Sequence, residues 1–328
     1  MLSDFSKNEI LMSCEYIKSH GLLPKKGAVV NIIGSSILCD YLKDTFRSLN
    51  DKTEYGYTVY QSDNADTLSS TVSKQCFLYC FDARVQDTYA LIDLKNALKY
   101  ASGIKNAQFI AMVIIPPLTQ RSDLISLSEM ELSAISQETF LSAVEEELSS
   151  YCDKLDIREI RFDNFLIEDS SYNALNLNKI ATDAINSGCV TIESNDAFDI
   201  VSAASMSDAV DAVFTVMKNG KHGNIYNMSG ESMSVYDLKS FVYKSLSEYG
   251  IKLSFSDNSD TDKKAYRVLS TGKLQSLGYS TVCDNDTRVL YALSDIAGDK
   301  YPVIANKTNE LYDGKLQYIR NMELELLR

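Results

Sequence analysis

The sequence is poor in the residues that build metal centres. It has no tryptophan, four prolines and two histidines in 328 residues. A structural zinc site needs four cysteine or histidine ligands at close spacing, but His20 and His222 lie far apart, and Cys76 and Cys80 supply a single close pair. We therefore expect no metal site. In a strand the two close cysteines point to one face, and we expect them to be small core side chains.

Long apolar runs and a signal-like N-terminus are also missing. No stretch approaches the roughly 20 apolar residues of a membrane span, and the first ten residues, MLSDFSKNEI, lack the basic and apolar regions of a secretory signal. The seven cysteines are odd in number and scattered, which fits reduced thiols better than a disulfide framework. These absences predict a cytoplasmic protein without a membrane span.

Positive charge is sparse. The 32 lysines and arginines are outnumbered by 45 acidic residues, which gives a net charge of −13 at pH 7. Basic residues gather only in short pairs, such as Lys25-Lys26 and Lys263-Lys264. Because nucleic acids are attracted by clustered positive charge, we expect no nucleic-acid partner.

What the sequence does contain is a repeated strand and helix pattern, which begins with VVNIIGSSILCDYL at residues 29–42. Apolar strands alternate with amphipathic helices as far as about residue 165, and shorter elements follow. This pattern predicts an α/β fold, a Rossmann-like doubly wound parallel sheet with a small C-terminal α/β lobe. The main predicted strands are 28–33, 57–60, 76–81, 107–115 and 157–162, and the helices are 3–20, 37–49, 87–100, 127–155, 206–218 and 234–249.

The same pattern divides the chain into four segments. Residues 1–27 form an N-terminal helical extension, because a helix precedes the first strand. Residues 28–165 form the Rossmann-like nucleotide-binding-type domain. Residues 166–298 form a small substrate-type lobe interleaved with it, and residues 299–328 form a linker and a helix that lead toward a further domain.

Short motifs occur in a fixed order along the second half of the chain, at residues 161–165 (RFDNF), 200–213 with Asp208, 223–230 (GNIYNMSG) and 273–279 (KLQSLGY). Together they resemble motifs of the extended short-chain dehydrogenases, the NAD-dependent epimerase/dehydratase group that acts on nucleotide sugars. The resemblance implies NAD or NADP as the cofactor and a nucleotide sugar as the ligand. It also implies a homodimer through a helix bundle, which would use the helices at 87–100 and 127–155.

The turn after the first strand departs from that family. A dinucleotide-binding turn uses three glycines, for the sharp turn, for close approach of the pyrophosphate and for packing of helix on strand. At G-x-x-G-x-x-G spacing, these positions hold Ile33, Ser36 and Cys39, and only the off-register Gly34 remains. We therefore predict that neither NAD nor NADP is bound tightly.

Some candidate cofactor-binding residues remain in and near this turn. The backbone N–H groups of residues 34–37, Gly34, Ser35, Ser36 and Ile37, could bind an anion at the helix start. The alternative is that the two serines only cap the helix. Asp63 follows the second strand, where Rossmann folds place an acid that holds the ribose hydroxyls.

The proton-transfer groups of the family are missing. Its chemistry needs a tyrosine, a lysine four residues later on the same helical face, and a serine or threonine. No Y-x-x-x-K occurs, and the equivalent positions hold Phe140 and Val144, so we assign no catalytic residue. Tyr151 and Lys154, three residues apart late in the helix, are a poor substitute. Asn164 is a candidate substrate-binding residue, as its family counterpart is, or an ordinary loop asparagine.

Three functions remain open. The first, which the combined losses favour, is an epimerase/dehydratase-like protein of nucleotide-sugar or surface-polysaccharide metabolism with impaired or lost catalysis, a pseudoenzyme. The second is an active nucleotide-sugar epimerase, dehydratase or reductase with a non-standard site. The third is a structural or dimerisation module. It rests on residues 309–328, whose amphipathic pattern resembles the helix that opens a LicD-type phosphotransferase domain; the chain would then be part of a longer protein.

Overall fold

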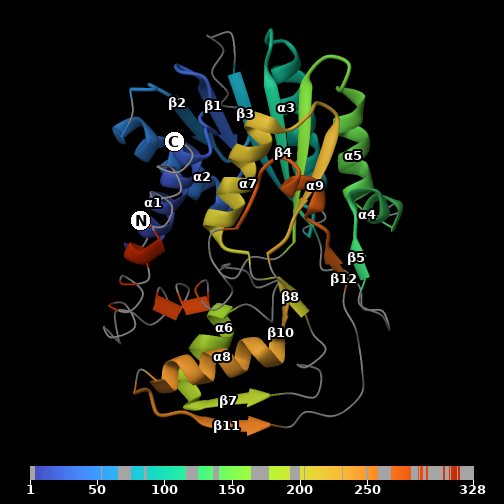
Figure 1. The fold of residues 1–328 in the computed structure, drawn as a ribbon. Helices are drawn as coiled ribbons and strands as arrows, with labels where there is room; N and C mark the ends of the chain where they lie inside the picture. Colours follow the sequence, from blue (N-terminus) through green and yellow to red (C-terminus); the bar gives the residue numbers. More distant parts are fainter. Residues whose placement is uncertain are drawn as a thin grey trace.

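The centre of the molecule is a six-stranded parallel sheet, seen in a computed structural model of the chain (Figure 1). The structure describes residues 4–52, 54–65, 75–84, 87–115, 125–135, 140–163, 177–192, 200–202, 204–230, 232–248, 250–257 and 267–281, with scattered positions from 287 onward. The strand order is β2-β1-β3-β4-β6-β9. The strands are β1 (Val29–Ile33), β2 (Thr58–Ser62), β3 (Gln75–Asp82), β4 (Gln108–Ile114), β6 (Asp156–Phe162) and β9 (Asn224–Met228). The predicted Rossmann-like α/β class is thereby confirmed.

The strand order reverses once, between β1 and β3. The chain runs from β1 outward to β2 and then returns to the other side of β1, so β1 pairs with both β2 and β3 in parallel. In doubly wound sheets, such a reversal opens a crevice at the carboxyl ends of the strands, where ligands bind. The carboxyl ends of β1 and β3 therefore define the place to look for a site.

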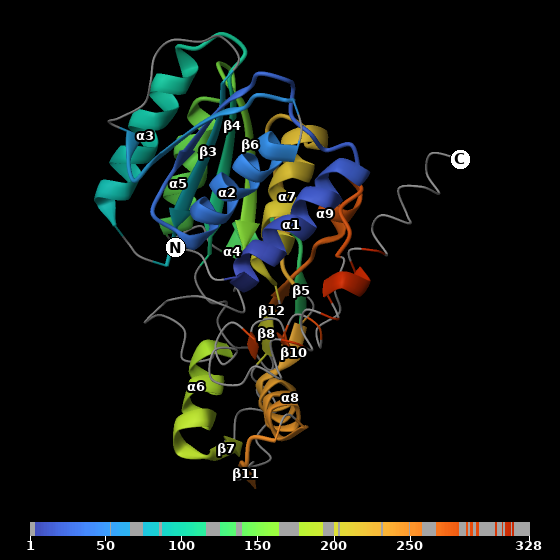
Figure 2. The ribbon, with the colours of Figure 1, turned by 90° about the vertical axis from the view of Figure 1, so that its left-hand side faces the viewer.

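Two helical layers cover the sheet. The helices α1 (Asp4–Ser19), α2 (Ile37–Lys52) and α7 (Met206–Asn219) lie on one face, and α3 (Thr88–Ser102) and α5 (Phe140–Ser150) lie on the other (Figure 2). Each layer encloses its own apolar core. The N-terminal helix belongs to the first layer, because α1 packs against α2 and α7 through Ile10, Cys14 and Ile17.

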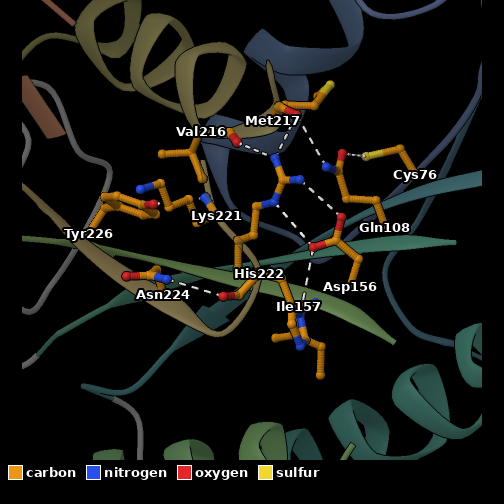
Figure 3. Close-up of polar contacts among 11 residues, drawn as sticks. Cys76, Gln108, Asp156, Ile157, Val216, Met217, Lys221, His222, Asn224 and Tyr226 are labelled. Atoms are coloured by element: carbon orange, nitrogen blue, oxygen red, sulfur yellow. Dashed lines mark hydrogen bonds and ion pairs between the residues drawn. The ribbon is translucent and has the colours of Figure 1, made fainter. Parts of the chain in front are cut away.

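The end of α7 is fixed to the sheet by Arg158 of β6 (Figure 3). Its guanidinium donates to the carbonyls of Val216 and Met217 at 2.7 and 2.8 Å and pairs with Asp156 at 2.9 Å. A helix leaves its last carbonyls without partners inside the helix, so a buried arginine there stabilises the end. Gly220 makes room for this contact, because an added Cβ would lie 3.2 Å from Arg158 Cδ and 2.5 Å from Val216 O.

The predicted helix over 127–155 is wrong at its start. Residues 125–127 form a short strand, β5 (Ile125–Leu127), which pairs in parallel with β12 (Arg267–Leu269). A new helix, α4 (Glu129–Ile135), begins after Ser128, whose N–H and hydroxyl both donate to Glu131. The Ser128 hydroxyl also accepts from the N–H of Glu131 at 3.4 Å, and this serine cap starts the helix.

The second part of the chain builds a small lobe with its own core. It contains α6 (Leu177–Ser187), α8 (Val235–Glu248) and the parallel pair β7 (Cys189–Ile192) and β11 (Ser254–Asp257). Between lobe and sheet lie the antiparallel strands β8 (Ile200–Ser202) and β10 (Ser232–Ser234), and α9 (Gly272–Gln275) packs on β9. The carboxyl ends of the sheet strands face this lobe (Figure 1).

The predicted absence of a membrane span and of a metal site can be compared only with the described part of the chain. None of the described helices is long and apolar enough to cross a membrane, and the described residues contain no cluster of three or more metal-ligating side chains. Asn164 and most of the predicted tail helix over 309–328 lie outside the described residues.

Candidate functional site

The candidate site is the carboxyl edge of the sheet around the reversal between β1 and β3. Gly34 opens the turn that follows β1 and has a φ of +126°. An added Cβ would lie 2.9 Å from the carbonyl oxygen of Cys80 on β3, so only glycine fits here. Its N–H donates to the carbonyl of Ser62 at 2.9 Å, which ties the turn to the end of β2.

The two serines of the turn have different roles. Ser36 caps α2, because its hydroxyl accepts from the N–H of Leu38 at 3.1 Å and its carbonyl accepts from the N–H of Cys39 at 2.9 Å. Ser35 is exposed. Within the part of the chain that the structure describes, the N–H groups of Ser35 and Ile37 have no acceptor, whereas the N–H of Ser36 is directed at the Cys39 sulfur. The turn thus combines a serine cap with free donors at a helix start, where an anion is stabilised.

Asp63 lies at the same edge. It directly follows Ser62, the residue that Gly34 contacts, and its side chain is exposed. Asp63 therefore follows the residue that Gly34 contacts, and its role in cofactor binding stays a prediction.

The positions that we assigned from the sequence to the proton-transfer pair hold packed side chains. Val144 of α5 is fully buried in the core between the sheet and the helices α3 and α5. Phe140, at the start of α5, stacks on Phe81 of β3 with ring centroids 5.6 Å apart. An ammonium at position 144 would have to enter an apolar core, whereas Phe140 is only partly buried.

The substitute pair lies at the wrong end. Tyr151 and Lys154 form turns between α5 and the start of β6, which is the amino edge of the sheet. The lysine ammonium lies 5.9 Å from the centre of the tyrosine ring. Because the carboxyl ends of the strands lie at the opposite edge, this pair cannot serve a ligand bound there.

Sequence reasoning missed an arginine at the site. Arg84 follows β3 and makes a two-pronged ion pair with Asp82, from Nε at 2.8 Å and from a terminal nitrogen at 2.6 Å. Its side chain is buried, whereas the carboxylate of Asp82 is partly exposed. The sequence D-x-R after an apolar strand is the signal that could have identified it. Since Asp82 neutralises it, Arg84 adds little net positive charge to the edge.

The arginine of the R-x-x-N motif has a structural role. Arg161 of β6 is fully buried and contacts Glu159 at 2.7 Å, Glu145 at 2.6 Å and Ser133 at 2.8 Å. It also donates to the carbonyl of Glu129 at 3.0 Å, which holds the start of α4 against the sheet. Burial raises the pKa of Glu159 and Arg161 opposes this rise. With two carboxylates against it, Arg161 has no charge left for a ligand.

Comparison with known proteins supports the fold. No family model and no curated protein matches the sequence. Among solved structures, UDP-glucose 4-epimerase is 16% identical, with a TM-score of 0.61 over 84% of this chain and 98% of that one. A GDP-L-fucose synthetase from Naegleria fowleri is 10% identical, with a TM-score of 0.63 over 84% of this chain and 94% of that one.

A dTDP-glucose 4,6-dehydratase from Streptomyces venezuelae, solved with NAD and TYD bound, is 12% identical, with a TM-score of 0.56 over 84% of this chain and 99% of that one. At identities this low, the likeness establishes the fold alone. The chain therefore has the fold of the NAD-dependent epimerases and dehydratases of nucleotide sugars.

Proposed function

We propose that this chain is an epimerase/dehydratase-like protein of nucleotide-sugar or surface-polysaccharide metabolism in which catalysis is impaired or lost. The observation that carries the proposal is the packing of Phe140 and Val144, which leaves the proton-transfer positions without an ionisable group. General acid–base catalysis requires such a group within reach of the substrate. The proteins of similar fold include a dTDP-glucose 4,6-dehydratase and a UDP-glucose 4-epimerase, and these names support a nucleotide sugar as the ligand class.

The turn fits a phosphate better than a whole dinucleotide. The free N–H groups of Ser35 and Ile37 suit one phosphate, but Ser36 and Cys39 stand where a pyrophosphate site has glycines. The carboxylates of Asp63 and Asp82 lie at the same edge and repel an anion. NAD or NADP would bring hydride chemistry if bound, and we expect a Kd of roughly 0.1–1 mM, about −5.5 to −4 kcal/mol.

Calorimetric titration with NAD, NADPH and UDP- and dTDP-sugars, followed by turnover assays, tests this proposal. We expect weak binding without turnover. Ser35→Asp should abolish the binding, because a carboxylate then faces the free N–H groups. Ser149→Asp, an exposed change near the far end of α5, should leave it unchanged. Turnover of any of these sugars would establish an active enzyme instead.

We also propose that α3 and α5 form a homodimer interface. The two helices contact each other on one face of the molecule, with Lys95 and Glu147 3.6 Å apart. On α3, Tyr89 is 79% exposed and Ile92 is 56% exposed, which is unusual for large apolar side chains. Sedimentation should show a dimer that Ile92→Lys dissociates. Asp51→Lys, on α2 at the opposite face, should keep it. A monomeric wild-type chain would refute this interface.

A further inference from the structure

Two cysteines meet beneath the turn at the reversal between β1 and β3. Cys39 comes from the first turn of α2 and Cys80 comes from β3. A Cβ added to Gly34 would lie 3.1 Å from Cys80 Cβ and 3.5 Å from Cys39 Sγ, so both side chains approach the same point. Cys39 is fully buried and Cys80 is 9% exposed. The pair occupies the space that a glycine leaves open in a dinucleotide-binding turn.

The two thiols are chemically unequal. The neighbouring Cys39 thiol lowers the pKa of Cys80, and Ser36 and the charge of Arg84 lower it as well; burial and the charge of Asp82 oppose them, and the net shift is downward. The proximity of Cys80 raises the pKa of Cys39, and burial raises it as well. Cys80 is therefore the thiol that ionises first, and thiolates are the reactive form of cysteine.

We propose that Cys39 and Cys80 form a reversible disulfide when the protein meets a small-molecule disulfide. The Cys80 thiolate attacks one sulfur of the oxidant, whose S–S bond breaks and releases one small thiol. Cys39 then loses its proton and attacks Cys80 Sγ, which releases the second small thiol. The two cysteines lose two electrons and two protons, and the oxidant gains them as two thiols.

The other described cysteines lack this arrangement. Cys76 lies at the opposite end of β3, where its thiol donates to Gln108 at 3.6 Å and burial raises its pKa to about 12. Cys14 donates to the carbonyl of Thr45 at 3.8 Å, and burial likewise raises its pKa to about 12. Neither forms a thiolate at neutral pH. Hydrogen bonds from Ser254 and Thr191 lower the pKa of Cys189 on β7, so we expect that thiol to take up glutathione as a mixed disulfide, which peptide mapping distinguishes from a link between Cys39 and Cys80.

The disulfide would change the turn directly. It would link the start of α2 to β3 and close a loop over residues 39–80, which restricts the unfolded chain. The oxidised protein should therefore unfold at a higher temperature than the reduced protein. It would also hold the turn of residues 34–37 in one position.

The test is equilibration of the folded protein in buffers of reduced and oxidised glutathione, followed by alkylation of free thiols and peptide mass mapping. We expect one linked pair of peptides containing Cys39 and Cys80, about 2 Da lighter than the two thiol peptides together because two hydrogens leave. Excess dithiothreitol should reverse it. The midpoint of thermal unfolding should rise on oxidation.

The variants make the test specific. Cys39→Ser should lose both the linked peptide and the rise in midpoint, and should collect glutathione on Cys80. Cys76→Ser should behave as the wild type. Three wild-type results would overturn the proposal: free thiols at both positions in the most oxidising buffer, glutathione left on Cys80 without a link, or a link that involves Cys76.

Discussion

Replacing Val144 by lysine tests whether the position that we assign to the family's proton-transfer lysine lies in a core or in an open cleft. In the structure, Val144 is fully buried in the apolar core under the sheet. A lysine there must place its ammonium in apolar surroundings or disrupt the packing of α5. At an open site the same lysine would reach water and cost little.

The magnitude follows from the shift in the lysine pKa. Full burial lowers a lysine pKa by about 3–5 units from its unfolded value of about 10.4. At pH 7 the charge term is then about 4–5 kcal/mol, at about 1.4 kcal/mol per unit. Because the folded pKa is the lower one, the penalty falls as pH rises, to about 2 kcal/mol at pH 9. A packing cost of about 1–3 kcal/mol adds to this at every pH.

Urea unfolding of both proteins at roughly pH 7 and pH 9 measures the difference. Subtracting the wild-type free energy of unfolding at each pH removes the contribution of the titratable groups that the two proteins share. Ser149→Lys on the exposed face of the same helix should change the unfolding free energy by less than about 0.5 kcal/mol. A Val144→Lys protein within about 1 kcal/mol of the wild type, with no dependence on pH, would show that the position faces water and would refute the reasoning.

Three further changes test the parts around the site. Gly34→Ala should lower the free energy of unfolding in urea by about 2–4 kcal/mol, because backbone strain and a clash with Cys80 combine. The control Gly27→Ala, at positive φ with open space around it, should lower it by only about 1–2 kcal/mol. Equal losses would contradict the close approach of Gly34 to Cys80. Arg158→Met should lower the unfolding free energy by about 2–4 kcal/mol, since the last carbonyls of α7 lose a charged donor; a loss below about 1 kcal/mol would argue against its capping role. Burial raises the pKa of Asp211 in the folded protein well above its usual range. The wild type therefore loses stability as pH rises from the usual aspartate pKa to this raised folded-state pKa. Asp211→Asn should therefore be more stable than the wild type at about pH 8 and no more stable at about pH 3.5, as measured by denaturation at both values, and the opposite order would contradict the burial of that carboxyl.

Much of the fold could be predicted from the order of residues. Residues 107–115 are apolar except for Gln108, which is typical of strands buried on both faces of a parallel sheet, and β4 lies within that run. The helices α1, α2, α3, α7 and α8 begin and end within a few residues of their predicted bounds. The strand at residues 125–127 was missed because three residues carry almost no periodicity, and the predicted helix began on its last residue.

Only part of the candidate site could be predicted from the sequence. The loss of the glycines and of Y-x-x-x-K can be read directly from the sequence. Arg84 was missed because an arginine near a turn is usually a solvated side chain, and only its bond to Asp82 distinguishes it. The roles of Arg161 depend on Glu129, Ser133 and Glu145, which lie 16 to 32 residues away in the chain.

The sequence by itself determined the class of fold, the place of the first turn and the absence of a tyrosine and lysine pair, because local periodicity and residue identity are properties of the chain alone. Only the tertiary structure decided that Val144 lies in a core and that Tyr151 lies at the far edge of the sheet. It also decided that Cys39 and Cys80 meet beneath Gly34. These facts depend on the pairing of β1 with β3 and the docking of α2 and α5. Such contacts join residues distant in sequence, whose approach no local pattern encodes.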